Sequence, residues 1–418
     1  MGKAGAEPAQ MDTASGQSEV SLWFLFWTFL KIGSIAFGGF TALISVVENI
    51  IVRKQKLLEP EDMLDGISLA MLLPGPVAVN VVAFVGYRLR GGLGALFSAA
   101  GVILPSFSLL VGLSFFYLQY GQIPSVSNAF AGFVPAVMAI IVNTAWGMSK
   151  KAVTGWTEFL IALSAALVLL VIGGFYSTLM IIFGAGLLGL VLFSRNSSGK
   201  ETKVRESFLS DGISPLPRHS RIIFSLSMLL LAGFLVAFSV PWPRLANDSY
   251  GRIFVTFSGM SLMLFGGGFV FIPLIQKIVV DGIHWVTQAE FTSAIALGQI
   301  TPGPILISAA FIGYKVKGFF GAALATLAIF FPPALLMVSS SQMLDRIKGS
   351  RFIKAALRGV RAAVVGMIFS AAVVIGRGAV LHWGTLMIFL VAFVALVHLR
   401  IDVVWIIPAA GVIGILLY

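Results

Sequence analysis

The chain has 418 residues and no cysteine; 58% of its residues are hydrophobic, 11% are charged, and the formal net charge is +11. A soluble domain usually carries about 25% charged residues, so this composition excludes an ordinary soluble fold, and the lack of cysteine excludes disulfides, thiolate metal sites and cysteine nucleophiles. The positive charge is typical of the cytoplasmic loops of a membrane protein, and no basic run interleaved with aromatic residues indicates a nucleic-acid partner.

Residues 1–20 are expected to form a polar tail, because the first 19 residues lack the apolar core of a cleaved signal peptide. Six apolar segments follow, at residues 22–52, 62–90, 91–118, 128–149, 157–172 and 174–194. About 20 apolar residues span a bilayer as a helix, and these segments lack the alternating polarity of a membrane β-barrel. They predict an all-α, polytopic protein in contact with the lipid bilayer.

The second part of the chain repeats this organisation. A polar stretch at 195–221 has the composition of a solvated linker, and one lone apolar segment follows at 222–240. Six further apolar segments lie at 250–280, 287–317, 318–344, 352–377, 382–399 and 402–418. We therefore expect four parts: a polar tail (1–20), a first transporter repeat (21–195), a cytoplasmic linker with a connecting membrane helix (196–245) and a second repeat (246–418).

Short motifs recur between the two halves at a nearly constant offset. Phe37-Gly38-Gly39 corresponds to Phe265-Gly266-Gly267, and Pro74-Gly75-Pro76 corresponds to Pro302-Gly303-Pro304, both 228 residues apart. After one gap, Gly86-Tyr87 matches Gly313-Tyr314 at an offset of 227. A series in this order predicts an internal duplication.

The lone segment at 222–240 predicts that the repeats are inverted. If each six-segment half crosses the membrane six times, one extra helix starts the second half from the opposite side, as in many secondary transporters. With the N-terminus and the 195–221 linker in the cytoplasm, most basic clusters also fall inside, including Arg88 and Lys277. The exceptions are Arg53, Lys54, Lys56, Lys315 and Lys317, which would be explained if the Pro-Gly-Pro segments do not cross fully.

The Pro-Gly-Pro tripeptides predict broken helices. Proline removes an amide hydrogen and disrupts the preceding turn, and irregular backbone at membrane depth must be buried in protein or line a wet cavity. A second half-helix beginning at Pro76 or Pro304 would direct its free amides and positive dipole end into the break, which favours an anion. The alternative is a kinked packing helix.

Neutral polar residues near the breaks could add hydrogen bonds to a tetrahedral oxyanion. They are Asn80, Gln299, Thr301 and Ser308. Their alternative role is to join packed helices.

Several charged residues are candidates for the anion path. Lys31 lies about nine residues into the first segment, roughly 13 Å along a helix, where a lysine is costly and often functional, unless it snorkels to the interface. Arg358 and Arg361 share a helix face and could supply forked donors, or could anchor the cytoplasmic end of the helix.

Two repeat-matched pairs of charged residues lie beside the broken segments. The bases Arg88 and Lys315 could line an anion path or serve as interfacial anchors. The acids Asp62 and Glu290 could carry a coupling proton, although capping of the following helix is the favoured interpretation.

The sequence contains no signature of a cofactor or of hydrolytic chemistry. It has no Gly-x-x-x-x-Gly-Lys-Ser/Thr nucleotide loop, and its four histidines do not show the spacing of metal ligands. We therefore expect no cofactor, no metal and no enzymatic activity.

The motifs resemble those of the chromate ion transporter family in its long-chain, two-domain form. The resemblance rests on Phe37-Gly38-Gly39, Leu73-Pro74-Gly75-Pro76 with Gly86-Tyr87-Arg88, Leu104-Pro105-Ser106, and the second-half set Phe265-Gly266-Gly267, Gln299-Ile300-Thr301-Pro302-Gly303-Pro304 and Gly313-Tyr314-Lys315. It covers residues 20–195 and 250–418. It implies a multi-pass protein of the bacterial inner membrane that moves chromate, usually outward, driven by an ion gradient.

These observations predict a secondary active oxyanion transporter in which one inverted half rocks against the other. The expected substrate is chromate or the similar dianion sulfate, and a homodimer is a further expectation. The substrate site is expected to draw on Lys31, Gly38, Gly39, Pro74, Gly75, Pro76, Asn80, Gly266, Gly267, Gln299, Thr301, Pro302, Gly303, Pro304, Arg358 and Arg361. The alternatives are a passive anion channel and a membrane-bound chromate reductase; the lack of cysteine, of paired histidines for haem and of a flavin loop disfavours the reductase.

Overall fold

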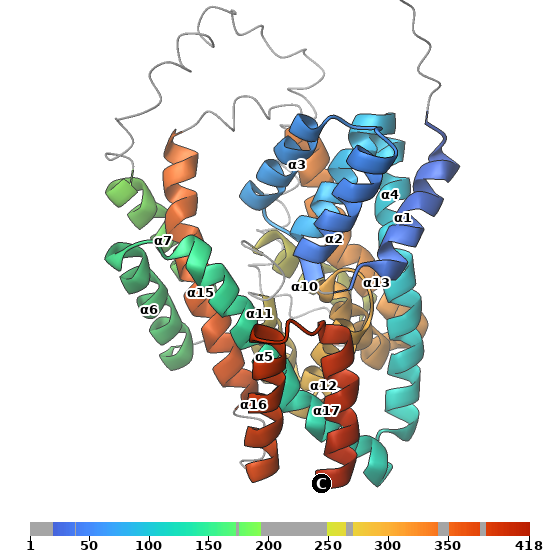
Figure 1. The fold of residues 1–418 in the computed structure, drawn as a ribbon, viewed down its shortest axis with the longest axis vertical. Helices are drawn as coiled ribbons and strands as arrows, with labels where there is room; N and C mark the ends of the chain where they lie inside the picture. Colours follow the sequence, from blue (N-terminus) through green and yellow to red (C-terminus); the bar gives the residue numbers. More distant parts are fainter. Residues whose placement is uncertain are drawn as a thin grey trace, which may run out of the picture.

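The computed structural model describes residues 20–37, 39–172, 175–193, 249–264, 271–341, 351–376 and 382–418, and every element in these ranges is helical (Figure 1). The described residues include four helices that are long and apolar enough to cross a membrane; they lie at Val77–Tyr120, Pro124–Ala152, Ile305–Ser341 and Lys354–Gly376. Large apolar side chains also face outward, as at Phe183, Leu187 and Val191. A surface of this kind needs lipid around it, so the chain is a multi-pass membrane protein.

The described part of the first half contains seven α-helices and one π-helical segment. In chain order they are α1 (Leu22–Ile35), α2 (Gly39–Val47), the turn η1 (Glu48–Lys54), α3 (Pro60–Leu72), α4 (Val77–Tyr120), α5 (Pro124–Ala152), α6 (Trp156–Val171) and α7 (Phe175–Phe193).

The described part of the second half follows the same order. Its elements are α10 (Tyr250–Leu262), α11 (Phe271–Gln276), the π-helical turn η4 (Lys277–Gly282), α12 (Gln288–Ile300), the 3-10 turn η5 (Ile305–Ile307), α13 (Ser308–Ser341), α15 (Arg351–Gly376), α16 (Trp383–Val397) and α17 (Val403–Leu417).

The first two expected segments of the first half are each broken into shorter helices. Helix α1 has 14 residues and α3 has 13, which is roughly 20 Å each and less than the thickness of about 30 Å of a bilayer core. The predicted breaks at Phe37-Gly38-Gly39 and at the two Pro-Gly-Pro motifs are therefore confirmed where the chain is described. Six full crossings for each half, in contrast, do not fit helices of this length.

The position of each proline is a correction to the expected helix start. Pro76 lies just before α4 with an extended ψ of 101°, and Pro304 precedes η5 with a ψ of 130°. Each proline therefore ends the irregular segment, and the helix begins one residue later at Val77 or, after the 3-10 turn, at Ser308.

Helices α4 and α13 each fold back on themselves. The turn in α4 is at Arg90-Gly91, and a Cβ added to Gly86 would lie 2.3 Å from the Gly94 carbonyl oxygen. In a straight helix, residues eight apart lie roughly 12 Å apart, so the two arms must run side by side. Helix α13 turns in the same way at Lys317-Gly318. The expected boundaries at 90/91 and 317/318 are confirmed.

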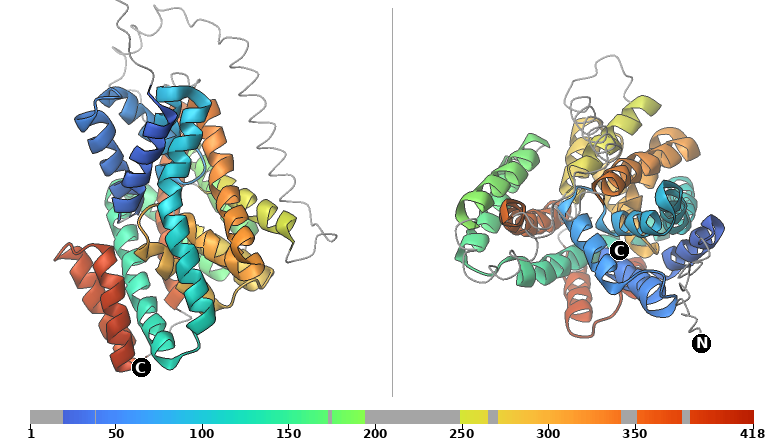
Figure 2. Two further views of the ribbon diagram at one scale, coloured as in Figure 1. Left: turned by 90° about the vertical axis from the view of Figure 1, so that its right-hand side faces the viewer. Right: turned by 90° about the horizontal axis from the view of Figure 1, so that it is seen from above.

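The packing divides the molecule into two bodies that do not coincide with the sequence halves. Helices α1–α4 pack with α10–α13, chiefly through the contacts of α1 and α13 with α4 and of α10 with α13; we call this the core body. Helix α5 packs on α16 and α17, α15 packs on α6 and α7, and α5 and α15 meet; we call this the flanking body. Figure 2 (right) shows α6, α7 and α15 on one side, away from α1–α4.

Small residues allow the close crossings within the flanking body. A Cβ added to Gly132 of α5 would lie 2.2 Å from the carbonyl oxygen of Ala410 in α17, and one added to Gly359 of α15 would lie 2.0 Å from that of Ala185 in α7. Backbones that approach this closely are a common basis of helix association in membranes. The last two helices of each half thus pack against a long helix of the other half: α6 and α7 pack on α15, and α16 and α17 pack on α5.

Some expected features lie outside the described residues. They are Gly38, Gly266 and Gly267, most of the polar tail, the 195–221 linker and the connecting helix at 222–240. The four-part division of the chain therefore stays a prediction.

Candidate functional site

The two Pro-Gly-Pro breaks each bind the opposite half of the chain. The Gly75 amide donates to the Leu264 carbonyl oxygen at 2.7 Å, and the Gly303 amide donates to the Ala36 carbonyl oxygen at 2.8 Å. Leu264 and Ala36 are themselves 228 residues apart and directly precede the two Phe-Gly-Gly motifs. Each Pro-Gly-Pro break is therefore joined to the residue that precedes the Phe-Gly-Gly motif of the other half.

Only glycine fits at the centre of each break. Gly75 has a φ of +112° and Gly303 a φ of +106°, a region in which side chains are strained. A Cβ on Gly75 would lie 2.2 Å from the Pro333 Cβ atom, and one on Gly303 would lie 2.3 Å from the Ser106 Oγ atom. The backbone of each break is thus pressed against the second arm of α13 or α4.

The second break is much more polar than the first. Gln299, Thr301 and Ser308 flank it and are 7%, 5% and 1% exposed. Their matched positions in the first half hold Met71, Leu73 and Asn80. The duplicated backbone therefore carries two chemically different sites.

Two buried donors at the second break have no hydrogen-bond partner. They are the Gln299 Nε2 group and the Ser106 hydroxyl, which belongs to α4 but lies against Gly303. The Thr301 hydroxyl, by contrast, donates to the Gly298 carbonyl oxygen at 3.0 Å. Buried polar groups are nearly always paired, so these two unpaired groups are donors that an acceptor such as an anion could use.

The first break offers an acceptor instead. The Asn80 Nδ2 group donates to the Pro74 carbonyl oxygen at 3.2 Å, and the Asn80 Oδ1 atom is buried without a partner. The Asn80 side chain must direct its nitrogen, and not its oxygen, toward the Pro74 carbonyl oxygen, because two oxygens that face each other cannot form a hydrogen bond. This arrangement does not favour an anion.

The matched charges form one ion pair in each half. Asp62 contacts Arg88 at 2.9 Å, and Glu290 contacts Lys315 at 2.7 Å. Each pair joins the helix before a Pro-Gly-Pro break to the helix after it. We call the Asp62–Arg88 region the first mouth and the Glu290–Lys315 region the second mouth.

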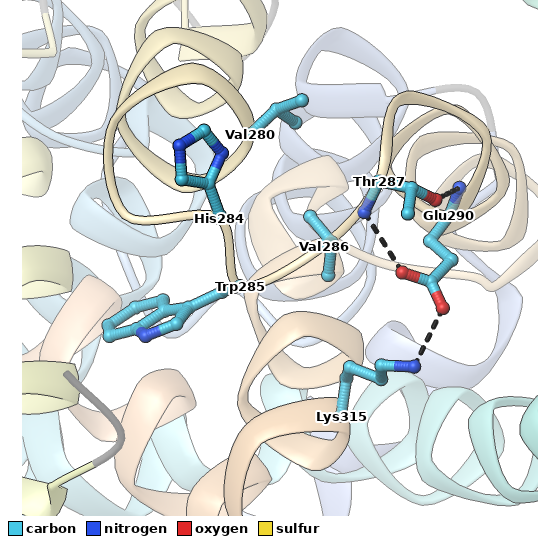
Figure 3. A pocket seen from close by; sticks show the side chains of 7 residues that line it. All are labelled: Val280, His284, Trp285, Val286, Thr287, Glu290 and Lys315. Carbon is cyan, nitrogen blue, oxygen red and sulfur yellow. Dashed lines mark hydrogen bonds and ion pairs between the residues drawn. The ribbon is translucent and has the colours of Figure 1, made fainter.

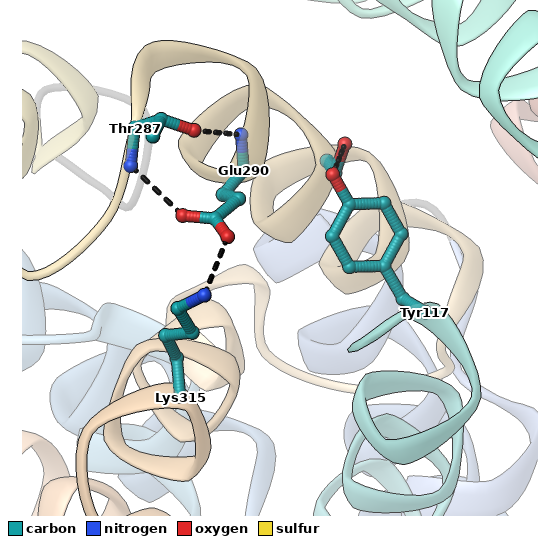
Figure 4. Close-up of polar contacts among 5 residues, drawn as sticks. Tyr117, Thr287, Glu290 and Lys315 are labelled. Carbon is teal, nitrogen blue, oxygen red and sulfur yellow. Dashed lines mark hydrogen bonds and ion pairs between the residues drawn. The ribbon is translucent and has the colours of Figure 1, made fainter. Parts of the chain in front are cut away.

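The two mouths lie at opposite ends of the second arm of α4. The first mouth adjoins the Arg90-Gly91 turn where this arm begins, whereas Tyr117 near its far end accepts a hydrogen bond from Ser293 of α12, one turn beyond Glu290 (Figure 4). From Gly91 to Tyr117 the helix covers roughly 40 Å. The separation exceeds the bilayer core, which is about 30 Å thick.

This arrangement corrects the expected distribution of some basic residues. Lys56 lies in the segment between η1 and α3, six residues before Asp62 in the chain. Lys277 begins η4, whose residue Val280 lines the same pocket as Lys315. Lys277 and Lys315 were expected on opposite sides, but η4 and Lys315 meet at the same pocket.

Glu290 has the capping role that the sequence favoured. Thr287 and Glu290 form a reciprocal capping box at the start of α12, with bonds of 2.9 and 3.2 Å (Figure 4). Glu290 lies outside the four candidate spans. Burial raises the pKa of Glu290, but the hydrogen bonds from Lys315 and Thr287 together lower it by more than burial raises it. The net pKa of Glu290 therefore lies below its usual value.

The second mouth contains a shallow pocket of about 340 Å³ (Figure 3). Its lining residues are Val280, His284, Trp285, Val286, Thr287, Glu290 and Lys315. His284 has a φ of +54°, and the matched residue Lys56 has a φ of +51°. A basic residue thus occupies an unusual backbone conformation at the matched position of both repeats.

The remaining predicted site residues lie elsewhere. Lys31 is on the exposed face of α1. Arg358 donates from Nε to Glu158 at 2.7 Å, and its guanidinium lies 4.3 Å from the Phe193 ring centroid. Arg361 is exposed on α15. The contacts of Arg358 are within the flanking body rather than at a break, and a substrate role for these three residues stays a prediction.

Three residues were missed by sequence reasoning. Ser106 belongs to the noted Leu104-Pro105-Ser106 motif, but its approach to Gly303 depends on tertiary packing. Glu158 is only 2% exposed, and its position at the start of an apolar segment was the one available signal. His284 had no signal except its match to Lys56. Among the described residues, no three His, Cys, Asp or Glu side chains gather as metal ligands would.

Broken helices, breaks interleaved between duplicated halves, and charged mouths at opposite ends define a membrane transport protein. The comparison with known families agrees with this class. The chain belongs to the chromate transporter family, whose model matches residues 23–190 and 251–415. The two matched regions coincide closely with the two halves.

Several curated proteins are similar over most of their length. An uncharacterized transporter of Methanocaldococcus jannaschii is 29% identical over 375 residues, which cover 89% of each chain. A protein named probable chromate transport protein, from Synechococcus elongatus, is 29% identical over 88% of each chain. The chromate transport protein of Cupriavidus metallidurans is 28% identical over 93% of this chain and 92% of its own. No solved structure matches the chain.

Proposed function

We propose that this protein is a secondary active transporter of a tetrahedral oxyanion, with chromate as the substrate exported across the bacterial plasma membrane. The observation that carries the proposal is the second break, where Ser106, whose Oγ atom lies against Gly303, and Gln299, at the end of α12, each have a buried side-chain polar group without a hydrogen-bond partner. Backbone amides and the dipole at the start of a helix also favour an anion.

The site proposed for the anion is therefore narrower than the sequence prediction. Gln299, Thr301, Pro302, Gly303 and Pro304 would provide its wall, and Ser106 would donate from α4. Asn80 and Pro74-Gly75-Pro76 at the first break would support the backbone, since the free atom of Asn80 is an acceptor. Roles for Gly38, Gly39, Gly266 and Gly267 follow only from their position in the repeat.

An inverted arrangement of the halves is part of the proposal. It is supported by the two mouths, which lie at opposite ends of the second arm of α4. Each half also contributes two of the four candidate spans, an even number, so one connecting helix at 222–240 would start the second half from the opposite side. With the N-terminus in the cytoplasm, the first mouth would face the cytoplasm and the second mouth the exterior.

The test is chromate uptake into everted membrane vesicles, with sulfate and molybdate as competitors. The proposal expects saturable uptake of chromate that at least one of the other tetrahedral anions reduces. Ser106→Ala should weaken chromate uptake about tenfold, since a charge-assisted hydrogen bond contributes roughly 1.5 kcal/mol. Uptake that equals that of vesicles without the protein would refute the proposal.

A further inference from the structure

The pocket at the second mouth combines an accessible cation with a restrained anion. Lys315 and Glu290 have side chains that are 38% and 17% exposed. Glu290 is held by the capping box, with its Oε2 atom accepting from the Thr287 amide and its Oε1 atom accepting from Lys315. The lysine ammonium has three donors, and the bond to Glu290 uses one of them.

The same series of charges recurs at the matched positions of the first half. Lys56 matches His284, Asp62 matches Glu290, and Arg88 matches Lys315. Lys56 and His284 share the left-handed conformation, which costs a residue other than glycine roughly 1 kcal/mol. His284 lines the pocket with the Glu290–Lys315 pair, and a strained basic residue at this matched position of both halves indicates a function beyond closing a loop.

We propose that the second-mouth pocket is an access site for the oxyanion, in which Lys315 binds the anion in competition with Glu290. The inference rests on the proposed transport function and adds a second, outer binding site to it. His284, Trp285 and Val286 also line this pocket (Figure 3). His284 would add a donor for the anion, and Trp285 and Val286 make part of the lining apolar.

The neighbouring carboxylate gives the site a suitable affinity. An anion on a transport path must be held firmly enough to enter and weakly enough to leave. Glu290 offsets much of the Lys315 charge, and the nearby Lys277–Asp281 pair at 2.9 Å is neutral as a unit. The pocket therefore binds an oxyanion weakly, and the unpaired side-chain donors at the second break bind it more tightly.

The test compares two substitutions that break the same ion pair. Lys315→Gln removes the proposed ligand, whereas Glu290→Gln removes its competitor. Chromate transport by each variant is measured in proteoliposomes, with the anion presented from each side in turn. Because a charged hydrogen bond contributes about one to two powers of ten, we expect Lys315→Gln to raise the KM roughly tenfold and Glu290→Gln to lower it about threefold, both from one side only.

Matched variants separate this effect from general charge and folding effects. Lys317→Gln removes a nearby positive charge outside the pocket and should change the KM less than twofold. His284→Asn keeps a residue that tolerates the left-handed conformation and should raise the KM. Arg88→Gln and Asp62→Asn should reproduce the opposed shifts from the other side. Thermal unfolding confirms that each variant is folded.

The outcomes distinguish the two proposals. If Lys315→Gln and Glu290→Gln shift the KM in the same direction, the ion pair only holds α12 and α13 together. That result refutes the access site but leaves the proposed transport function intact. If the wild-type protein transports no oxyanion from either side, both the proposed function and the access site are refuted.

Discussion

Gly75 and Gly303 show how strongly single residues constrain the site. Both have a φ above +100° and both face an atom of the other half within 2.3 Å of an added Cβ. The sequence was sufficient to predict that these glycines break a helix, because Pro-Gly-Pro cannot continue one. It could not predict that each glycine amide would bind a carbonyl of the other half, since that contact depends on how the halves interleave.

Replacing a glycine of this kind by alanine should separate the cost of a strained φ from the cost of a steric clash. Gly75→Ala would force a methyl group against the rigid Pro333 ring, in addition to a strained φ, and should destabilise the protein by about 3 kcal/mol or more. Gly318→Ala is the matched control, because its φ is +62° but no atom lies within 4 Å of the added Cβ; strain alone should cost roughly 1–2 kcal/mol. Equal losses of thermal stability would contradict the tight docking of the break.

Gln299 should contribute to transport at the expense of stability. Its Nε2 group is buried without a partner, and such a group costs about 1–3 kcal/mol. Gln299→Leu should therefore raise the melting temperature while it lowers chromate transport roughly tenfold. Met71→Leu, at the matched position of the first break, should leave transport unchanged. A variant at position 299 that transports normally would exclude Gln299 from the anion site.

Among the elements, the broken segments follow from local sequence and the packing of the flanking body does not. Proline, glycine and apolar runs mark the breaks and the α4 and α13 turns. No local pattern indicates that α6 and α7 pack on α15 of the other half. The Glu158–Arg358 ion pair is a consequence of this exchange, so sequence reasoning assigned Arg358 to the substrate without knowledge of its acidic partner.

The two partners of this ion pair should respond differently to substitution. Glu158 is 2% exposed, but the Arg358 side chain is 50% exposed. Arg358→Met would leave a buried carboxylate unpaired and cost about 3 kcal/mol, whereas Glu158→Leu leaves an arginine that water can solvate and should cost roughly 1 kcal/mol. The melting temperatures of both variants check this order.

The double variant decides the role of Arg358. Glu158→Leu combined with Arg358→Met should recover most of the lost stability, because no unpaired buried charge is left. If transport also recovers, Arg358 is structural. If the double variant is stable but inactive, the sequence-based assignment of Arg358 to the substrate is correct.

At the scale of the whole molecule, the division into bodies changes the expected motion. The duplication predicts that one half rocks against the other, but α4 and α13 come from different halves and pack together in the core body (Figure 1). The residues of the proposed anion site come from α4, α12 and the segment that leads into α13, and α12 also contacts α5 and α17 of the flanking body. Movement of the core body against the flanking body would expose the two Pro-Gly-Pro breaks first to one side of the membrane and then to the other, without separating the breaks from each other.

Cross-linking can distinguish the two motions, since the chain has no native cysteine. The rings of Phe107 in α4 and Phe319 in α13 are 5.9 Å apart. Cysteines at these positions link the halves within the core body, and their cross-link should leave transport largely intact. A cross-link between facing positions of α12 and α5 joins the two bodies and should abolish it. The reverse result would favour rocking of the halves.

The central claim is that the protein moves chromate by secondary active transport. The most direct measurement is chromate accumulation in proteoliposomes with an imposed ion gradient, with and without an ionophore that dissipates it. The account predicts an internal chromate concentration above the external one, which collapses when the ionophore is added. Chromate that only equilibrates across the membrane would identify a passive channel, and chromate that does not enter at all would contradict the assigned function.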